Sequence, residues 1–152
     1  MNTQTPTPNA SPSDERVYMS LLVLQGSPFC NIDCDYCYLP NRSDTRRMSM
    51  HVLEKTLERV CEAGLIGPPF EVLWHAGEPL AVPVSYYEKA IDVINRFPEA
   101  RDQASFVFQT NAMLLNDAWT DFFKAHNAHV GVSIDGPDHV HDALRVLSLI
   151  HI

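Results

Sequence analysis

The sequence has few basic residues, with 11 Lys and Arg against 19 Asp and Glu, and its formal charge is −8 at pH 7. Nucleic-acid binding needs cations that neutralise backbone phosphates, so this balance argues against nucleic acid as a partner. No apolar run approaches the roughly 20 residues that a helix needs to cross a bilayer. The first residues also lack the basic start and apolar centre of a signal peptide. We therefore expect a cytoplasmic protein that does not contact a membrane.

Cysteine is scarce as well, with four in 152 residues. Without a secretory signal, clustered thiols more often bind metal or take part in catalysis than form disulfides. Cys30, Cys34 and Cys37 have a Cys-x3-Cys-x2-Cys spacing. A closed zinc site uses four ligands and a disulfide uses two, so three thiols leave one coordination position open.

Strand-like and helix-like segments alternate after residues 1–16, which are rich in Thr, Pro, Asn and Ser and are expected to form a disordered leader. The apolar run over residues 17–25 predicts a buried parallel strand. Helices are expected from an N-cap at Ser49, from a capping box formed by Ser85 with Glu88, and from an N-cap at Asn116. Further strands are expected over residues 70–74, 105–109 and 129–134. This order predicts an α/β fold, either an open parallel sheet or a barrel.

Four polar clusters follow the four predicted strands. The cysteine loop follows the first strand, HAGEP (75–79) the second, QTNA (109–112) the third and SIDGP (133–137) the fourth. The carboxyl ends of parallel strands meet at one edge, where α/β folds place their sites. We therefore expect these clusters to form one pocket.

The three thiols allow more than one interpretation. A 4Fe–4S cluster held by three thiolates would keep one iron without a protein ligand. A zinc loop could instead be completed by His51, His75 or Cys61, and Cys34 with Cys37 could form a redox pair. The spacing and its place at the strand ends favour the cluster, while the zinc module and the thiol redox protein stay as alternatives.

The segments PFCNIDCDYCYLP, WHAGEP, QTNA and SIDGP together resemble the radical S-adenosylmethionine enzymes that carry a C-terminal SPASM extension. That group includes the anaerobic sulfatase-maturating enzymes and the cyclophane-forming peptide maturases. The similarity runs from about Tyr18 to Arg145. It implies a partial parallel (β/α) barrel, with about four of six strands present, in which residues 17–146 are the N-terminal part of the core domain.

The resemblance also implies a chemistry. Cys30, Cys34 and Cys37 match the ligands of a 4Fe–4S cluster, and S-adenosylmethionine would bind at the open iron. An electron donor reduces the cluster, and the 5′-deoxyadenosyl radical that results takes hydrogen from a peptide or protein substrate, which is oxidised or crosslinked. No catalytic residue is expected beyond the cluster site.

The resemblance further implies a set of cofactor-binding residues. Glu78 suits the ammonium group of the cofactor, Arg145 its carboxylate and Tyr36 its adenine, while Gly77 lets the backbone approach the ligand. Ala76 departs from the family pattern, which usually has a glycine there. The full set is Tyr36, Gly77, Glu78, Gln109, Asn111, Ser133, Asp135 and Arg145.

The last residues, LSLIHI (147–152), break the pattern before them. They resemble a translated sequencing adaptor, and we expect a non-native tail, the alternative being a real apolar strand or helix end. The resemblance thus implies an N-terminal fragment without the SPASM part, which is not expected to be active alone.

Overall fold

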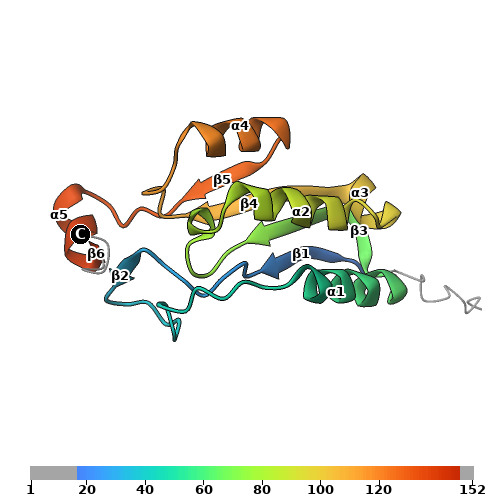
Figure 1. Ribbon diagram of the computed structural model, residues 1–152, viewed down its shortest axis with the longest axis horizontal. Coiled ribbons are helices and arrows are strands. Elements are labelled where there is room, and N and C mark those ends of the chain that lie inside the picture. The colour runs from blue at the N-terminus through green and yellow to red at the C-terminus, as the bar shows by residue number, and fades with distance from the viewer. Residues whose placement is uncertain (1–16, 148–152) are drawn as a thin grey trace, which may run out of the picture.

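The computed structural model describes residues 17–147 (Figure 1). The predicted leader over residues 1–16 and residues 148–152 of the predicted tail lie outside the described residues. A four-stranded parallel sheet forms the centre of the fold, with its strands in chain order β1-β3-β4-β5. The strands are β1 (Met19–Leu24), β3 (Ile66–Trp74), β4 (Ala104–Thr110) and β5 (His129–Val132). The predicted α/β class with four parallel strands is confirmed.

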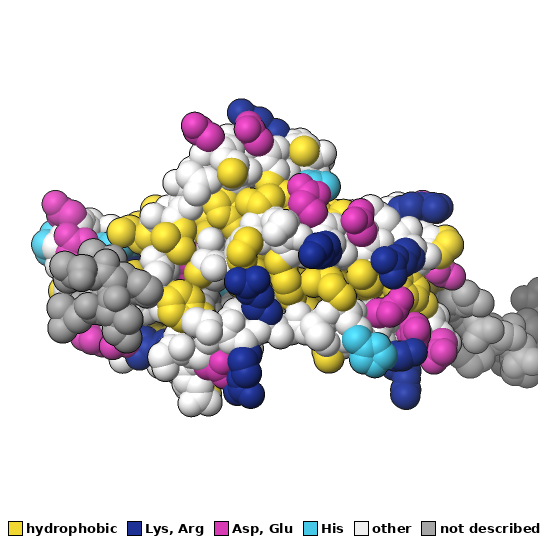
Figure 2. Space-filling model, viewed as in Figure 1, with side chains coloured by type: hydrophobic (Ala, Val, Ile, Leu, Met, Phe, Trp, Pro, Cys, Tyr) yellow, Lys and Arg dark blue, Asp and Glu magenta, His cyan; other side chains and the backbone are white. Residues whose placement is uncertain are grey.

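Three helices pack side by side along one face of this sheet (Figure 1). They are α1 (Met50–Glu62), α2 (Val84–Ile94) and α4 (Asp117–Ala125). Tyr87 of α2 lies at the centre of the core, with its ring 5.0 Å from the rings of Trp74 and Phe108. Trp119 and Phe122 of α4 complete this aromatic cluster, as the spacing of apolar residues predicts. Figure 2 shows hydrophobic side chains between α4 and α2, with acidic and basic side chains on the outer surfaces.

The predicted N-caps of α1 and α4 are confirmed. Ser49 Oγ accepts a hydrogen bond from Val52 N at 3.2 Å, and Asn116 Oδ1 accepts one from Trp119 N at 3.1 Å. Each bond satisfies a backbone N–H of the first turn that has no partner within the helix.

We expect Asn116→Ala to lower the free energy of unfolding by about 1 kcal/mol, because it leaves the N–H of Trp119 without its cap. Urea denaturation would measure the change. Asp121→Ala on the exposed side of α4 is the control and should shift stability by less than about 0.5 kcal/mol. Equal effects of the two substitutions would contradict a capping role for Asn116.

The prediction that β1 is a buried strand is wrong. Leu21 and Val23 are 42% and 51% exposed, whereas Leu24 is buried. The described helices cover one face of the sheet, and side chains alternate between faces along a strand. An apolar run predicts burial on both faces only where both faces are covered, and among residues 17–147 the face that carries Leu21 and Val23 is open.

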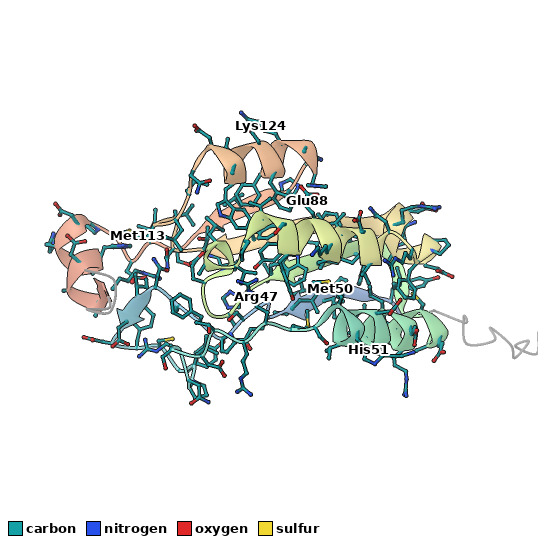
Figure 3. All side chains as sticks on the ribbon, in the orientation of Figure 1. Arg47, Met50, His51, Glu88, Met113 and Lys124 are labelled. Carbon is teal, nitrogen blue, oxygen red and sulfur yellow. The ribbon has the colours of Figure 1, made fainter. Side chains whose placement is uncertain are left out.

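The predicted capping box of the second helix is also wrong. The α2 helix begins at Val84, with Pro83 at the N-cap position and no side-chain cap. A proline is accommodated there because its missing N–H is not needed in the first turn. Glu88 instead places its Oε2 2.9 Å from His126 Nε2, between α2 and α4 (Figure 3).

Several short elements were not predicted. They are β2 (Ile32–Cys34), the 3-10 turn η1 (Pro79–Ala81), α3 (Pro98–Gln103), α5 (Asp138–Leu144) and β6 (Arg145–Leu147). Strands β2 and β6 pair antiparallel with Cys34 opposite Arg145, at the end of the molecule where α5 lies (Figure 1). Strands of three residues carry too little local pattern to be recognised without their partner. No helix within residues 17–147 has the length and apolar character to cross a membrane.

Candidate functional site

A cavity of about 230 Å³ lies where the loops after β1, β3, β4 and β5 meet. Its lining includes every residue that the sequence suggested for the cluster and the cofactor except Asp135: Cys30, Cys34, Tyr36, Cys37, Gly77, Glu78, Gln109, Asn111, Ser133 and Arg145. The carboxyl ends of parallel strands point to the same edge, so segments far apart in sequence share this cavity. The four polar clusters thus form one pocket as expected, while the binding role of each residue stays a prediction.

The three clustered cysteines have free thiols on the wall of this cavity. Burial raises the pKa of Cys30 and Cys34, and the nearby Arg145 and Arg42 act in the opposite direction on Cys34. Metal ligation needs thiolates, so a bound metal would have to stabilise the deprotonated forms. Three free thiols facing one cavity fit the donor set that an iron–sulfur cluster requires.

Across residues 17–147, no group of three or more His, Cys, Asp and Glu side chains is arranged to hold a metal ion. A cubane cluster binds each thiolate through a separate iron atom, so its ligands need not converge on one point. Of the side chains named for the zinc alternative, His75 lines the cavity, whereas His51 and Cys61 belong to α1.

Glu78 is 2% exposed, and the protein itself binds both of its carboxylate oxygens. Oε1 accepts hydrogen bonds from Leu80 N at 2.8 Å and Thr110 Oγ1 at 2.5 Å. Oε2 accepts one from Asn111 N at 2.8 Å. Burial raises the pKa of this carboxyl, and the three donors oppose that shift. Glu78 therefore joins the loop after β3 to the end of β4, a structural role that the sequence did not reveal. Contact with the cofactor's ammonium group stays a prediction.

Gly77 is required by contact with the cysteine loop. Its φ is +67°, and a Cβ placed on it would lie 2.4 Å from Ser27 O and 2.7 Å from Phe29 O. The next residue continues this contact, since Glu78 N donates to Phe29 O at 2.7 Å. The sequence interpretation assigned this glycine to close approach of the ligand, whereas the structure provides a reason within the protein. Ala76 also adopts a positive φ of 69°.

Gly77→Ala is expected to be more destabilising than Gly64→Ala, although both glycines have nearly the same φ, +67° and +63°. A Cβ added at Gly64 would have no atom within 4 Å, so alanine there should cost only the left-handed backbone strain of about 1 kcal/mol. The clash at Gly77 should add roughly 1–3 kcal/mol.

Urea denaturation of the two variants measures the difference. Equal losses of stability would show that the two loops can move apart at little cost to admit a Cβ. A steric clash would then not explain why position 77 is a glycine.

Asn111 connects the loop after β4 to the cysteine loop. Its Nδ2 donates to Asn31 Oδ1 at 2.8 Å and lies 3.9 Å from Cys30 Sγ. A similar contact joins the end of β4 to the loop after β5, where Gln109 Nε2 donates to Ser133 Oγ at 2.8 Å. These polar residues therefore bond to one another across the strand ends, so the cavity wall is held by the protein's own contacts.

Asp135 does not line the cavity, but it binds two residues that do. Its Oδ2 accepts hydrogen bonds from Tyr36 Oη at 2.6 Å and Arg145 Nε at 2.7 Å, and its Oδ1 accepts one from Arg145 Nη2 at 3.1 Å. The hydrogen bonds from Arg145 and then from Tyr36 lower the pKa of Asp135 below its ordinary value of 3.8. These bonds to the ionised carboxylate are therefore fully present when the pH is above 3.8. They are lost as the pH falls through the lowered pKa.

Sequence reasoning missed several residues of the site, including the cavity-lining residues Ile32, Tyr38 and Leu39. It also missed three residues that form hydrogen bonds to other members of the site. Thr110 is buried and donates a hydrogen bond to Glu78. Asn31 is also buried and accepts a hydrogen bond from Asn111. Arg42 donates to Cys34 O at 3.3 Å and forms an ion pair with Asp33. A threonine at the last position of a buried strand is a weak signal, because polar residues are common at strand ends.

Comparison with known proteins gives a family match. A model of the radical SAM superfamily matches residues 24–149. An uncharacterized protein of Synechocystis sp. is 37% identical over 130 residues, which cover 83% of this chain and 33% of that protein. A serine-type anaerobic sulfatase-maturating enzyme of Bacteroides thetaiotaomicron is 36% identical over 122 residues, which cover 76% of this chain and 29% of that enzyme. The chain thus spans about a third of the length of these curated relatives.

Solved structures have the same fold. The structure of anSMEcpe with bound AdoMet has a TM-score of 0.70 and 26% identity, and covers 84% of this chain and 35% of that one. The same enzyme with bound AdoMet and the Cp18Cys peptide has a TM-score of 0.67 at 27% identity, covering 82% of this chain and 34% of that one. Streptococcus suis SuiB, bound to its precursor peptide SuiA, is 20% identical with a TM-score of 0.58 over 84% of this chain and 27% of that one, which indicates the fold alone.

Proposed function

The chain belongs to the radical SAM superfamily, and we propose that Cys30, Cys34 and Cys37 bind a 4Fe–4S cluster whose open iron takes S-adenosylmethionine. One observation carries the proposal: the three free thiols share a cavity with the loops that follow β3, β4 and β5. A cluster bound to these thiols would lie beside the polar groups suited to the cofactor.

The chemistry that such a cluster supplies, when bound and reduced, is cleavage of S-adenosylmethionine to a radical that takes hydrogen from the substrate. The residues of this chain would hold and orient the reactants. Arg145 has an Nη1 group with no hydrogen-bond partner among residues 17–147, and its guanidinium suits the cofactor's carboxylate. The contacts of Glu78 keep the β3 and β4 loops in place around the cavity.

For the complete protein, we propose a peptide or protein substrate that is oxidised or crosslinked, and a reducing electron donor. The relatives support this class, since the curated ones include sulfatase-maturating enzymes and one solved neighbour was captured with the Cp18Cys peptide. The neighbour's bound AdoMet supports the proposed cofactor.

Anaerobic purification and reconstitution of the chain, followed by metal analysis, test the proposal. About four iron and four sulfide per chain support the cluster. Stoichiometric zinc would support the zinc module, and neither metal together with a reversible Cys34–Cys37 disulfide would support the thiol redox protein. Equilibrium dialysis of the loaded chain with labelled S-adenosylmethionine then tests the cofactor, and absence of binding would refute that part.

A further inference from the structure

We propose that Asp135 is a positioning residue that orients the Arg145 guanidinium toward the carboxylate of S-adenosylmethionine. This inference rests on the proposed function, because it concerns how the same cavity takes its cofactor. Asp135 itself is absent from the cavity lining, whereas Arg145 is part of it. Asp135 can therefore affect cofactor binding only through the lining residues that it binds, Tyr36 and Arg145.

The backbone of Arg145 is held by its own contacts. Strands β2 and β6 pair Arg145 with Cys34, and Asp35 N donates to Leu144 O at 3.1 Å. This pairing places Arg145 next to a proposed cluster ligand. It leaves open where the long side chain points, because an arginine has several rotatable bonds beyond its backbone.

Asp135 fixes that direction. Its two oxygens accept from Nε and Nη2 of Arg145 at 2.7 and 3.1 Å, a two-point contact that sets the plane of the guanidinium. With these two nitrogens engaged, the remaining Nη1 has no hydrogen-bond partner among the described residues. A second carboxylate can therefore bind this free edge without breaking the first contact.

Tyr36 fixes Asp135 in turn. Its hydroxyl donates to Asp135 Oδ2 at 2.6 Å, and its ring centre lies 5.7 Å from the Arg145 guanidinium carbon. Tyr36 belongs to the cysteine loop, between Cys34 and Cys37. Tyr36 and Asp135 thus tie the orientation of Arg145 to the loop that would hold the cluster. The guanidinium that would bind the carboxylate therefore keeps a fixed position relative to the cluster site.

Two effects of Asp135 on the cofactor oppose each other. Its negative charge repels the cofactor's carboxylate, which weakens binding. Its two-point contact holds the Arg145 side chain in place before the cofactor binds, so less side-chain entropy is lost on binding. Solvent and the intervening guanidinium screen the repulsion, while the orientation acts directly on the binding group. We therefore expect removal of the Asp135 charge to weaken binding.

A double-mutant cycle on the cluster-loaded chain tests this, with Kd for S-adenosylmethionine measured by equilibrium dialysis. Asp135→Asn should raise Kd about tenfold, which is close to the effect expected from losing one charge-assisted hydrogen bond. In an Arg145→Met background, the same Asp135→Asn change should leave Kd within about twofold, because the group that it orients is gone. Asp138→Asn, whose side chain is 91% exposed, is the control and should leave Kd unchanged.

Iron content is measured for every variant before binding. Loss of iron in Asp135→Asn would overturn the proposal, because it would show that Asp135 holds the cysteine loop rather than the guanidinium. Additive effects of the two substitutions, an unchanged Kd or tighter binding would overturn it as well. A wild-type chain that takes up no cluster or cofactor would refute the proposed function instead, so the two failures are distinguishable.

Discussion

Alanine in place of Cys30, Cys34 or Cys37 is expected to abolish iron binding, whereas Cys61→Ala should bind as much iron as the wild-type chain. The cluster would have three protein ligands, so removing one thiolate leaves too few to hold it against dissociation. Cys61 is the matched control because it is also a free cysteine, but it lies on α1 and does not line the cavity.

Iron and sulfide per chain, measured after anaerobic reconstitution and desalting, decide the outcome. Circular dichroism of each variant checks that a loss of iron does not come from unfolding. Full iron in a Cys34→Ala variant, or a comparable loss in Cys61→Ala, would contradict the ligand assignment.

Glu78→Gln is expected to have the second largest effect, lowering the free energy of unfolding by roughly 1–3 kcal/mol. The amide oxygen can still accept from Leu80 N and Thr110 Oγ1, but the amide nitrogen then faces the N–H of Asn111. Two donors would meet in a buried position, and a buried donor without an acceptor is costly. The volume of the side chain is preserved, so the effect isolates the hydrogen bonds.

Urea denaturation of the chain measures this loss. Glu88→Gln is the control, because Glu88 is half-exposed between α2 and α4 and bonds to His126 (Figure 3). Removing that exposed contact should cost less than about 1 kcal/mol. An unchanged stability in Glu78→Gln would show that the N–H of Asn111 finds another acceptor.

The larger elements of the fold could be predicted because their signals are local. The apolar positions of α1 recur at helical spacing, with Leu53 and Leu57 buried as expected, and Ser49 and Asn116 mark where helices begin. The strands after them are short apolar runs bounded by polar residues. Alternation of these segments is sufficient to indicate parallel strands, and parallel strands place the following loops on one edge.

Prediction from local sequence patterns failed where the structure depends on a neighbouring residue or on a distant part of the chain. The exposure of Leu21 and Val23 depends on what covers the second face of the sheet, and a run of apolar residues does not contain that information. The start of α2 depends on Pro83, which overrides the capping pattern of Ser85 and Glu88. The pairing of β2 with β6 joins residues more than a hundred positions apart, so neither strand is recognisable alone.

For this protein, the sequence by itself determined the family, the three-cysteine loop and the edge of the sheet where polar residues gather. These properties follow from residue type and spacing, which are local. Only the tertiary structure decided that Glu78 accepts hydrogen bonds from Leu80, Thr110 and Asn111. It also decided that Asp135, which does not line the cavity, accepts hydrogen bonds from two residues that do, Arg145 and Tyr36. A hydrogen bond depends on the distance and direction between two groups, and for distant residues these are set only once the chain has packed.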